Sequence, residues 1–156
     1  MECPLPLRTS GRRRRTHHPM TTTSLPDTWT GPTTNQLIDS ATDAGLIVCW
    51  ISPRHPRQAA YAHAGGIIWL RRDLTDAEAR SLLAHELGHC YYGDDGPQPP
   101  DIEARAWRWA ARLLITDGAY AMAERQVGPS VPGLAEHLHV TSEAVAAYQS
   151  ILRRVA

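Results

Sequence analysis

The stretch from Leu82 to Cys90 constrains this chain more than any other, because it contains the pattern H-E-x-x-H within a helical rhythm of apolar residues. Residues four apart lie above one another on an α-helix, so the imidazoles of His85 and His89 can bind one ion. Two neutral imidazoles and one further protein ligand suit tetrahedral zinc and leave a fourth position for water. Glu86 then lies where it can take a proton from that water. The motif therefore predicts a Zn²⁺ helix with Glu86 as the general base.

The surroundings of the motif favour this interpretation over two surface histidines that align by chance. Apolar residues keep helical spacing on both sides of it. Thr75 and Glu78 form the pattern of a capping box about ten residues upstream. Glycines and a proline in the stretch 93–97 break the pattern downstream. A helix from about Asp76 to Tyr92 is expected.

A carboxylate further along the chain is the candidate for the third metal ligand. The residues from Asp101 to Leu114 keep helical spacing, and Glu103 shares a stripe with Ala106 and Ala110. A carboxylate on an apolar stripe has to be paired, hydrogen-bonded or metal-bound, since a lone buried charge is costly. Small alanines permit a close helix approach, so Glu103 can reach the zinc helix. The alternative for Glu103 is a favourable position in the first turn of its helix, a role that Asp101 fits better.

The other segments predict an α+β fold. It consists of a small three-stranded sheet packed on the zincin-like H-E-x-x-H helix, followed by a C-terminal helical segment. The expected strands are 46–51, 59–64 and 67–70, and the expected further helices are 34–44, 119–126, 133–138 and 143–155. A strand edge beside the metal can hold an extended peptide by backbone pairing.

Three regions are expected along the chain. Residues 1–32 form a disordered basic tail rich in Thr and Pro, residues 33–127 the zincin-like core, and residues 128–156 a helix-turn-helix-like segment packed on that core. The run Arg12–Arg15 suits a basic arm for nucleic acid. The preferred alternative is that translation starts at Met20 and that the preceding residues are not made.

The balance of charges excludes a general attraction to nucleic acid or anionic membranes. The 156 residues include 16 basic and 16 acidic side chains, so the formal net charge is zero. No stretch approaches the length of an apolar transmembrane span. The odd number of cysteines, Cys3, Cys49 and Cys90, favours a reducing cytoplasm over secretion. Cys90 is expected to be a buried thiol rather than a metal ligand or redox switch.

The residues from Leu134 to Val145 have the rhythm of a helix-turn-helix motif. The helix that would read DNA offers Glu143, Tyr148 and Gln149, and no arginine precedes Arg153. Such a surface is poor for phosphate contacts. Packing or docking of a protein partner is therefore the expected role of this segment, and DNA binding is the alternative.

Together these segments resemble the ImmA/IrrE family of metallopeptidases. The similarity lies in Gly66–Leu70, Ala84–His89, Glu103–Ile115 and Leu134–Val145, and it extends over roughly residues 35–152. It implies a zinc-dependent endopeptidase of the gluzincin type. It also implies that His85 and His89 are metal ligands, Glu103 is the third ligand and Glu86 is the general base.

The family resemblance also carries expectations about the partner. Members are commonly encoded by phages and mobile elements, and the better-known ones act on a helix-turn-helix repressor. The implied partner is thus a protein substrate of that kind in a bacterial cytoplasm, with neither nucleic acid nor a membrane involved. Two alternatives stay open. One is a non-catalytic regulator with a structural zinc site that binds a repressor or DNA, and the other is a zinc hydrolase of small amides.

This chain departs from the family pattern near the expected third ligand. Trp107 stands where the family often has Asn or Asp, Trp109 where Phe is usual, and Thr116 where Pro often ends the helix. The polar residue that would support a ligand from outside the metal shell is therefore missing at position 107.

Stabilisation of the negative oxygen that forms during amide hydrolysis needs a hydrogen-bond donor. The residues that offer such a donor near the motif are His63, Arg71, Tyr91 and Tyr92, and no spacing distinguishes among them.

Overall fold

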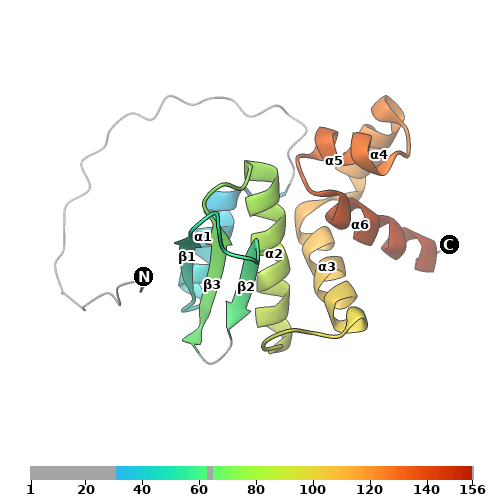
Figure 1. Cartoon of the computed structure of the whole chain (residues 1–156). Helices are drawn as coiled ribbons and strands as arrows, with labels where there is room; N and C mark the ends of the chain where they lie inside the picture. Colours follow the sequence, from blue (N-terminus) through green and yellow to red (C-terminus); the bar gives the residue numbers. More distant parts are fainter. Residues whose placement is uncertain (1–30, 63–64, 156) are drawn as a thin grey trace.

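The computed structural model describes residues 31–62 and 65–155, without the side chain of the last of these. The predictions for the basic tail, for Cys3 and for a start at Met20 lie outside the described residues. The elements are α1 (Thr34–Asp43), β1 (Ile47–Ile51), β2 (Ala59–Ala62), β3 (Ile67–Arg71), α2 (Asp76–Tyr92), α3 (Pro100–Leu114), α4 (Asp117–Val127), α5 (Val131–Leu138) and α6 (Ser142–Val155). The predicted α+β class is confirmed, with a sheet on one side of α2 and helices on the other (Figure 1).

The three strands form one mixed sheet in the order β1-β3-β2. β1 runs parallel to the central strand β3, with Ile47 opposite Ile67, whereas β2 runs antiparallel to β3, with Ala62 opposite Ile67. Gly66 enters β3 with φ +58°, a conformation that is easy only for glycine. In this order β1 and β2 are the edge strands, and β2 packs beside α2 together with β3.

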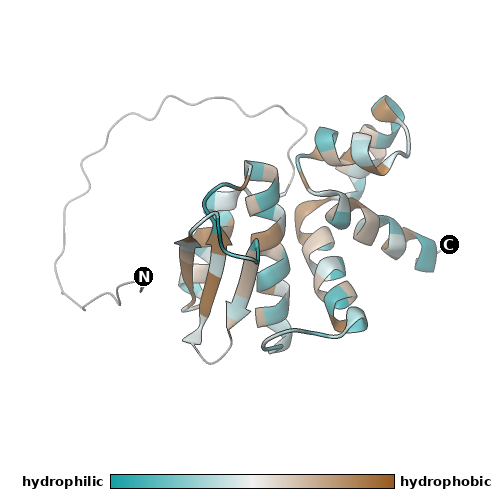
Figure 2. Ribbon diagram, in the orientation of Figure 1, coloured by the Kyte–Doolittle hydropathy of each residue, from teal (hydrophilic) through white to brown (hydrophobic). Residues whose placement is uncertain are grey.

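Local signals set the ends of α2 where the sequence predicted them. The Thr75 side chain accepts from the Glu78 backbone N–H at 3.3 Å, and the Glu78 carboxylate accepts from the Thr75 N–H at 2.8 Å. This is a capping box, which satisfies backbone donors that a helix start leaves free. At the other end, Gly93 takes the left-handed conformation with φ +70°. Figure 2 shows the hydrophilic loop that follows and leads into α3.

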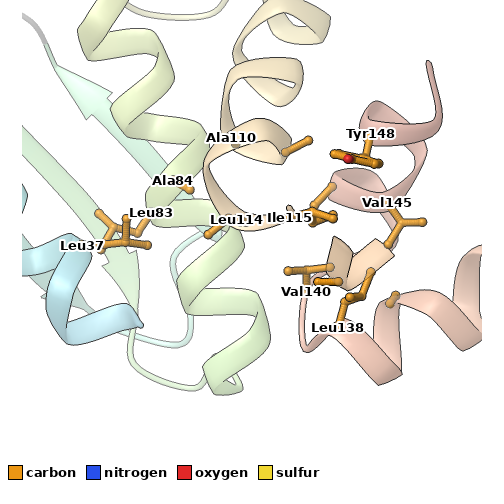
Figure 3. Packing of buried hydrophobic residues seen from close by; sticks show 14 of the residues in the cluster. Leu37, Leu83, Ala84, Ala110, Leu114, Ile115, Leu138, Val140, Val145 and Tyr148 are labelled. Carbon is orange, nitrogen blue, oxygen red and sulfur yellow. The ribbon is translucent and has the colours of Figure 1, made fainter. Parts of the chain in front are cut away.

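α2 is the centre of the fold, and most of its residues from Ala79 to His89 are buried. It contacts α1, β2 and β3 on one side and α3 on the other. Figure 3 shows Leu37 of α1 against Leu83 of α2 in this core. A Cβ atom at Gly88 would lie only 3.0 Å from the Ala106 carbonyl oxygen, so α3 approaches α2 as closely as backbone allows. Ala106 is fully buried at this contact, which is the close approach predicted from its size, whereas Ala110, also buried, is directed toward Tyr148 of α6 in Figure 3.

The C-terminal helices continue the same hydrophobic core. α6 packs on α3, and α5 packs on α4 and α6. Leu138 and Val140 lie against Val145 in Figure 3, and Tyr148 lies beside α3.

Polar anchors hold the turn between α5 and α6 on α2. The buried guanidinium of Arg80 donates to the carbonyl oxygens of Leu138 and His139 at 3.3 and 3.0 Å. It also donates to two carbonyl oxygens outside this turn, those of Pro32 and Leu114. The backbone N–H of Thr141 donates to the buried hydroxyl of Ser81 at 3.0 Å. The segment that resembles a helix-turn-helix thus makes direct hydrogen bonds with the helix that carries the motif.

Two helices begin two residues earlier than predicted, and α3 and α6 begin one residue earlier. α4 begins at Asp117 rather than 119, because Thr116 caps it by accepting from the Ala119 N–H. α5 begins at Val131 rather than 133, since Pro132 falls in the first turn, where no backbone N–H is required.

Two further expectations concern thiols and membranes. Cys90 is half-buried rather than fully buried, whereas Cys49 is buried. Among the residues that the structure describes, no helix is both long and apolar enough to cross a membrane.

Candidate metal centre

Three side chains from two helices converge at one point between α2 and α3. The Nε2 atoms of His85 and His89 lie 3.1 Å apart. The Oε2 atom of Glu103 lies 3.1 Å from the Nε2 atom of His85 and 3.5 Å from that of His89. The histidines are buried, and the side chain of Glu103 is 40% exposed. Glu103 therefore lies on the helix face predicted from its spacing to Ala106 and Ala110. Its carboxylate, however, lies at an open cleft and not in the core.

The chemistry of these groups suits a cation between them. Burial, together with the neighbouring His89, lowers the pKa of His85 to about 3, so its imidazole is neutral and can bind a metal. The Nε2 atoms of both histidines and the Oε2 atom of Glu103 are all potential ligand atoms, and they face one another. Atoms bound tetrahedrally to zinc at about 2.0–2.1 Å lie about 3.3 Å from one another, close to the separations seen here. Two imidazoles and one carboxylate are also a donor set that zinc accepts.

A carboxylate outside this group orients one of the histidines. The Oδ2 atom of Asp94 lies 3.1 Å from the Nδ1 atom of His89, and its Oδ1 atom accepts from Arg105 at 2.6 Å. The Nδ1 atom of His89 therefore carries the proton, and its Nε2 lone pair is directed at the candidate site. Arg105 in turn lies over the ring of Tyr92, 4.1 Å from its centroid.

The other histidine is held by an aromatic stack instead of a hydrogen bond. The ring of His85 lies 4.3 Å from the ring of Trp107, with an angle of 26° between the planes. The Nδ1 atom of His85 is buried and has no hydrogen-bond partner. The absence of a polar residue at position 107 thus has a direct structural counterpart. Trp107 restrains the imidazole of His85 by packing.

Glu86 lies beside the candidate ligands and is 7% exposed. Its burial and the carboxylate of Glu103 raise the pKa of Glu86 to about 7, while Arg57 and a hydrogen bond with the Tyr61 backbone act in the opposite direction. A carboxyl group with a pKa near neutrality can both accept and release a proton at ordinary pH.

The candidate centre lines an open cleft of about 580 Å³ between α2, α3 and the edge strand β2. The backbone of β2 forms one wall of the cleft. Arg57 and Arg71 supply positive charge to its lining, which also includes the uncharged Pro56 and Gln58. Arg71 is hydrogen-bonded to Asp73, whereas Arg57 is exposed.

The expected donors for a negative oxygen do not all reach this cleft. His63 lies outside the described residues. Tyr91 is 70% exposed and stacks on Trp109, and neither it nor Tyr92 lines the cleft. Arg71 lines the cleft but is bound to a carboxylate. Arg57, the exposed arginine of the cleft, differs from Arg71 in that its positive charge lowers the pKa of Glu86.

Two residues of the site, Asp94 and its partner Arg105, were not predicted from the sequence. Asp94 lies in the loop that ends α2, and Asp95 follows it, so nothing in the spacing separates the two acids. Their difference depends on Gly93, whose left-handed conformation turns the chain back toward His89. The pattern of a histidine followed five residues later by an acid after a helix-ending glycine was the available signal.

Comparison with known protein families gives one match. No curated protein matches the chain. Residues 51–148 match the family Peptidase_M78, described as the IrrE N-terminal-like domain. The matched region runs from the end of β1 into α6 and includes every residue of the candidate centre. The family supports a metallopeptidase, and the chain belongs to it, as its resemblance to the ImmA/IrrE metallopeptidases predicted.

Proposed function

We propose that this protein is a zinc-dependent endopeptidase that cuts a peptide bond in a specific protein partner. His85, His89 and Glu103 are the metal ligands in this proposal, and Glu86 is the general base. The observation that carries it is the convergence of the three ligand atoms, all within 4.8 Å of one another, beside a buried carboxyl group in an open cleft.

The chain's own residues divide the chemistry among them. Zinc held there would supply a water of lowered pKa and a positive charge for the developing negative oxygen. Glu86 accepts the proton of the attacking water and then releases it to the departing amine. A pKa of about 7, raised by burial and by Glu103, suits both steps. Asp94 keeps His89 in the tautomer that offers Nε2.

The edge strand supports a peptide as substrate. The Gln58 carbonyl accepts from the Arg71 N–H, so the backbone of Gln58 faces β3. Backbone groups alternate along an antiparallel strand, and those of Ala59 and Tyr61 therefore face the edge beside α2, where the Tyr61 backbone is already hydrogen-bonded to Glu86 and that of Ala59 lines the cleft. A substrate chain in extended form can pair with this edge and place its carbonyl near Glu86. A small amide is too short to pair with a strand edge, so this edge disfavours the alternative hypothesis of a hydrolase of small amides.

The partner we propose is a helix-turn-helix repressor of a phage or mobile element, in the cytoplasm of a bacterial cell. It rests on the family to which the chain belongs. The packing of α6 supports a protein partner over DNA. Tyr148 is buried and hydrogen-bonded to Asp117, and Gln149 donates to Tyr120 and to the Pro129 carbonyl. Both of these candidate DNA-reading residues are thus used inside the protein.

The test is cleavage of the repressor encoded beside this gene. The repressor is co-expressed with the wild type or with Glu86→Gln, and zinc is measured in both purified proteins. Gln has the shape of Glu and no basic carboxylate, so this variant separates metal binding from proton transfer. We expect about one zinc per chain in both proteins and cleavage by the wild type alone.

Two outcomes would contradict the proposal. Full cleavage by Glu86→Gln with zinc retained would remove Glu86 from the mechanism. Binding of the repressor by both proteins with cleavage by neither would favour the non-catalytic regulator, in which zinc is structural and His85→Ala costs mainly stability.

A further inference from the structure

A second hollow adjoins the cleft of the candidate centre. It also measures about 580 Å³, and it lies between the first turns of α2 and the turn that joins α5 to α6. Gln58, Leu82 and Trp107 line both hollows. The two hollows are therefore neighbours; together they are called the groove below, and they reach from Glu86 to the start of α6.

The far wall of this groove has a fixed position relative to the candidate centre. It is formed by Thr141, Ser142 and Glu143, at the start of α6. Thr141 donates its backbone N–H to Ser81, and Arg80 binds the two carbonyl groups just before Val140. Ser81 and Arg80 belong to α2, the helix that carries His85 and Glu86. A ligand in the far part of the groove is thus held in register with the reacting groups.

The far part of the groove is acidic. Its charged lining residues, among those that the structure describes, are Glu78 and Glu143. The carboxylate of Glu78 is engaged with Thr75 in the capping box. Glu143 is exposed and forms no ion pair with any described residue. The hydroxyl oxygen of Thr141 is buried there without a hydrogen-bond partner. The exposed carboxylate of Glu143 is thus an acceptor for a ligand that brings positive charge and hydrogen-bond donors.

The length of the groove indicates how many substrate residues separate the scissile bond from the side chain bound at the far end. Glu78 precedes Glu86 by eight residues on α2, which corresponds to about 12 Å along the helix axis. An extended peptide rises about 3.3 Å per residue, so about three to four residues span the distance. A peptide paired with β2 passes Gln58 on this course, since Gln58 lies next to the first residue of that strand.

We infer that the hollow beside Glu143 is a specificity site that receives an arginine or lysine of the cleaved protein, about three to four residues from the scissile bond. This inference rests on the proposed function and adds the chemistry by which the substrate is chosen. Guanidinium and ammonium groups match the carboxylate of Glu143 and the exposed hydroxyl group of Ser142 beside it. Leu82 and Trp107 contact the aliphatic part of the same side chain.

The experiment profiles cleavage of a peptide library by the full zinc-loaded chain. The library is a digest of a bacterial proteome prepared without trypsin. The new peptide termini that each protein produces are identified by mass spectrometry. The wild type is compared with Glu143→Gln, Glu143→Arg and the control Glu136→Gln. Glu136 is an exposed carboxylate on α5 outside the groove. Unfolding midpoints of all four proteins are measured alongside.

The wild type and the control should enrich Arg and Lys at one position about three to four residues from the cut. Glu143→Gln should lower kcat/KM for such peptides about tenfold relative to matched alanine peptides, and Glu143→Arg should shift the preference to Asp and Glu. If all four proteins cleave the library with the same residue preference at every position, the inference is overturned and the proposed function stays intact.

The repressor provides a second readout for the same four proteins. If it alone is cut, Glu143→Arg should slow its cleavage, and equal rates overturn the inference. If the wild type cuts neither peptides nor repressor, the proposed function fails and the inference fails with it.

Discussion

The Nδ1 atom of His89 lies 3.1 Å from the Oδ2 atom of Asp94, whose other oxygen accepts from Arg105. This relationship connects the last turns of α2, the loop after it and α3 through one carboxylate. Burial of Asp94 acts in the opposite direction, but the hydrogen bonds from His89 and Arg105 hold the pKa of its carboxyl below the ordinary value. The carboxylate is therefore ionised and can orient His89.

Removal of this carboxylate should weaken metal binding. Asp94→Ala leaves the imidazole of His89 free to rotate, and we expect zinc affinity to fall about 10- to 100-fold, with Asp94→Asn less affected. The measurement is a competition titration against a chelator of known affinity. Asp95→Asn is the control, because Asp95 is exposed in the same loop. Equal affinities for Asp94→Ala and Asp95→Asn would mean that His89 needs no orienting partner.

Replacement of Trp107 tests the stack on His85. Trp107→Ala removes an aromatic contact worth about 0.5–1.5 kcal/mol, and the freed imidazole should reduce zinc affinity several-fold. Trp107→Phe keeps a ring over the imidazole and should retain most of the affinity. The same titration measures both variants. If Trp107→Phe loses as much as Trp107→Ala, stacking is not what restrains His85.

The buried Glu86 should make the metal-free protein sensitive to pH. Burial and Glu103 raise the pKa of Glu86 to about 7, so its ionisation in the fold is unfavourable. Its contribution to stability is complete below the unfolded pKa of about 4.5 and is lost as the pH rises through about 7. The loss amounts to ~3 kcal/mol at most, from a difference of about 2.5 pKa units. Glu86→Gln should therefore be more stable than the wild type at pH 8 and similar near pH 4.5.

Chemical unfolding in the presence of a chelator measures this effect at both pH values. His85 acts in the opposite direction, because its lowered pKa of about 3 means that stability is lost as the pH falls below about 6.5. The difference between the wild type and Glu86→Gln cancels this second contribution. A difference that stays constant from pH 4.5 to pH 8 would show that Glu86 ionises as easily in the fold as in the unfolded chain.

Arg80 should matter for folding and not for zinc chemistry. The residue is 1% exposed, and its guanidinium donates to four carbonyl oxygens from three parts of the chain. Arg80→Met fills similar space but leaves these carbonyl groups without their donor, at a cost of about 2–4 kcal/mol in the free energy of unfolding. Denaturant unfolding of the zinc-loaded protein measures the loss. Arg72→Met, at an exposed position, is the matched control and should change stability little.

The sequence by itself determined the elements whose causes are local. Helical spacing, the capping box at Thr75 and the glycine at position 93 are contained within a few residues, and they predicted α2 to the residue. The histidines of the motif converge for the same reason, since one turn of helix is enough to bring them together. Glu103 was identified because a carboxylate among alanines is costly unless it has a partner.

Only the tertiary structure decided the relations between distant segments. β3 lies between β1 and β2, an order that no strand's own composition specifies, and this makes β2 the edge beside Glu86. The choice of Asp94 over Asp95, the stack of Trp107 on His85 and the attachment of the α5–α6 turn to Arg80 depend on packing across the chain. Such contacts are selected by burial of apolar surface and by the need to pair every buried polar group, which are properties of the whole fold.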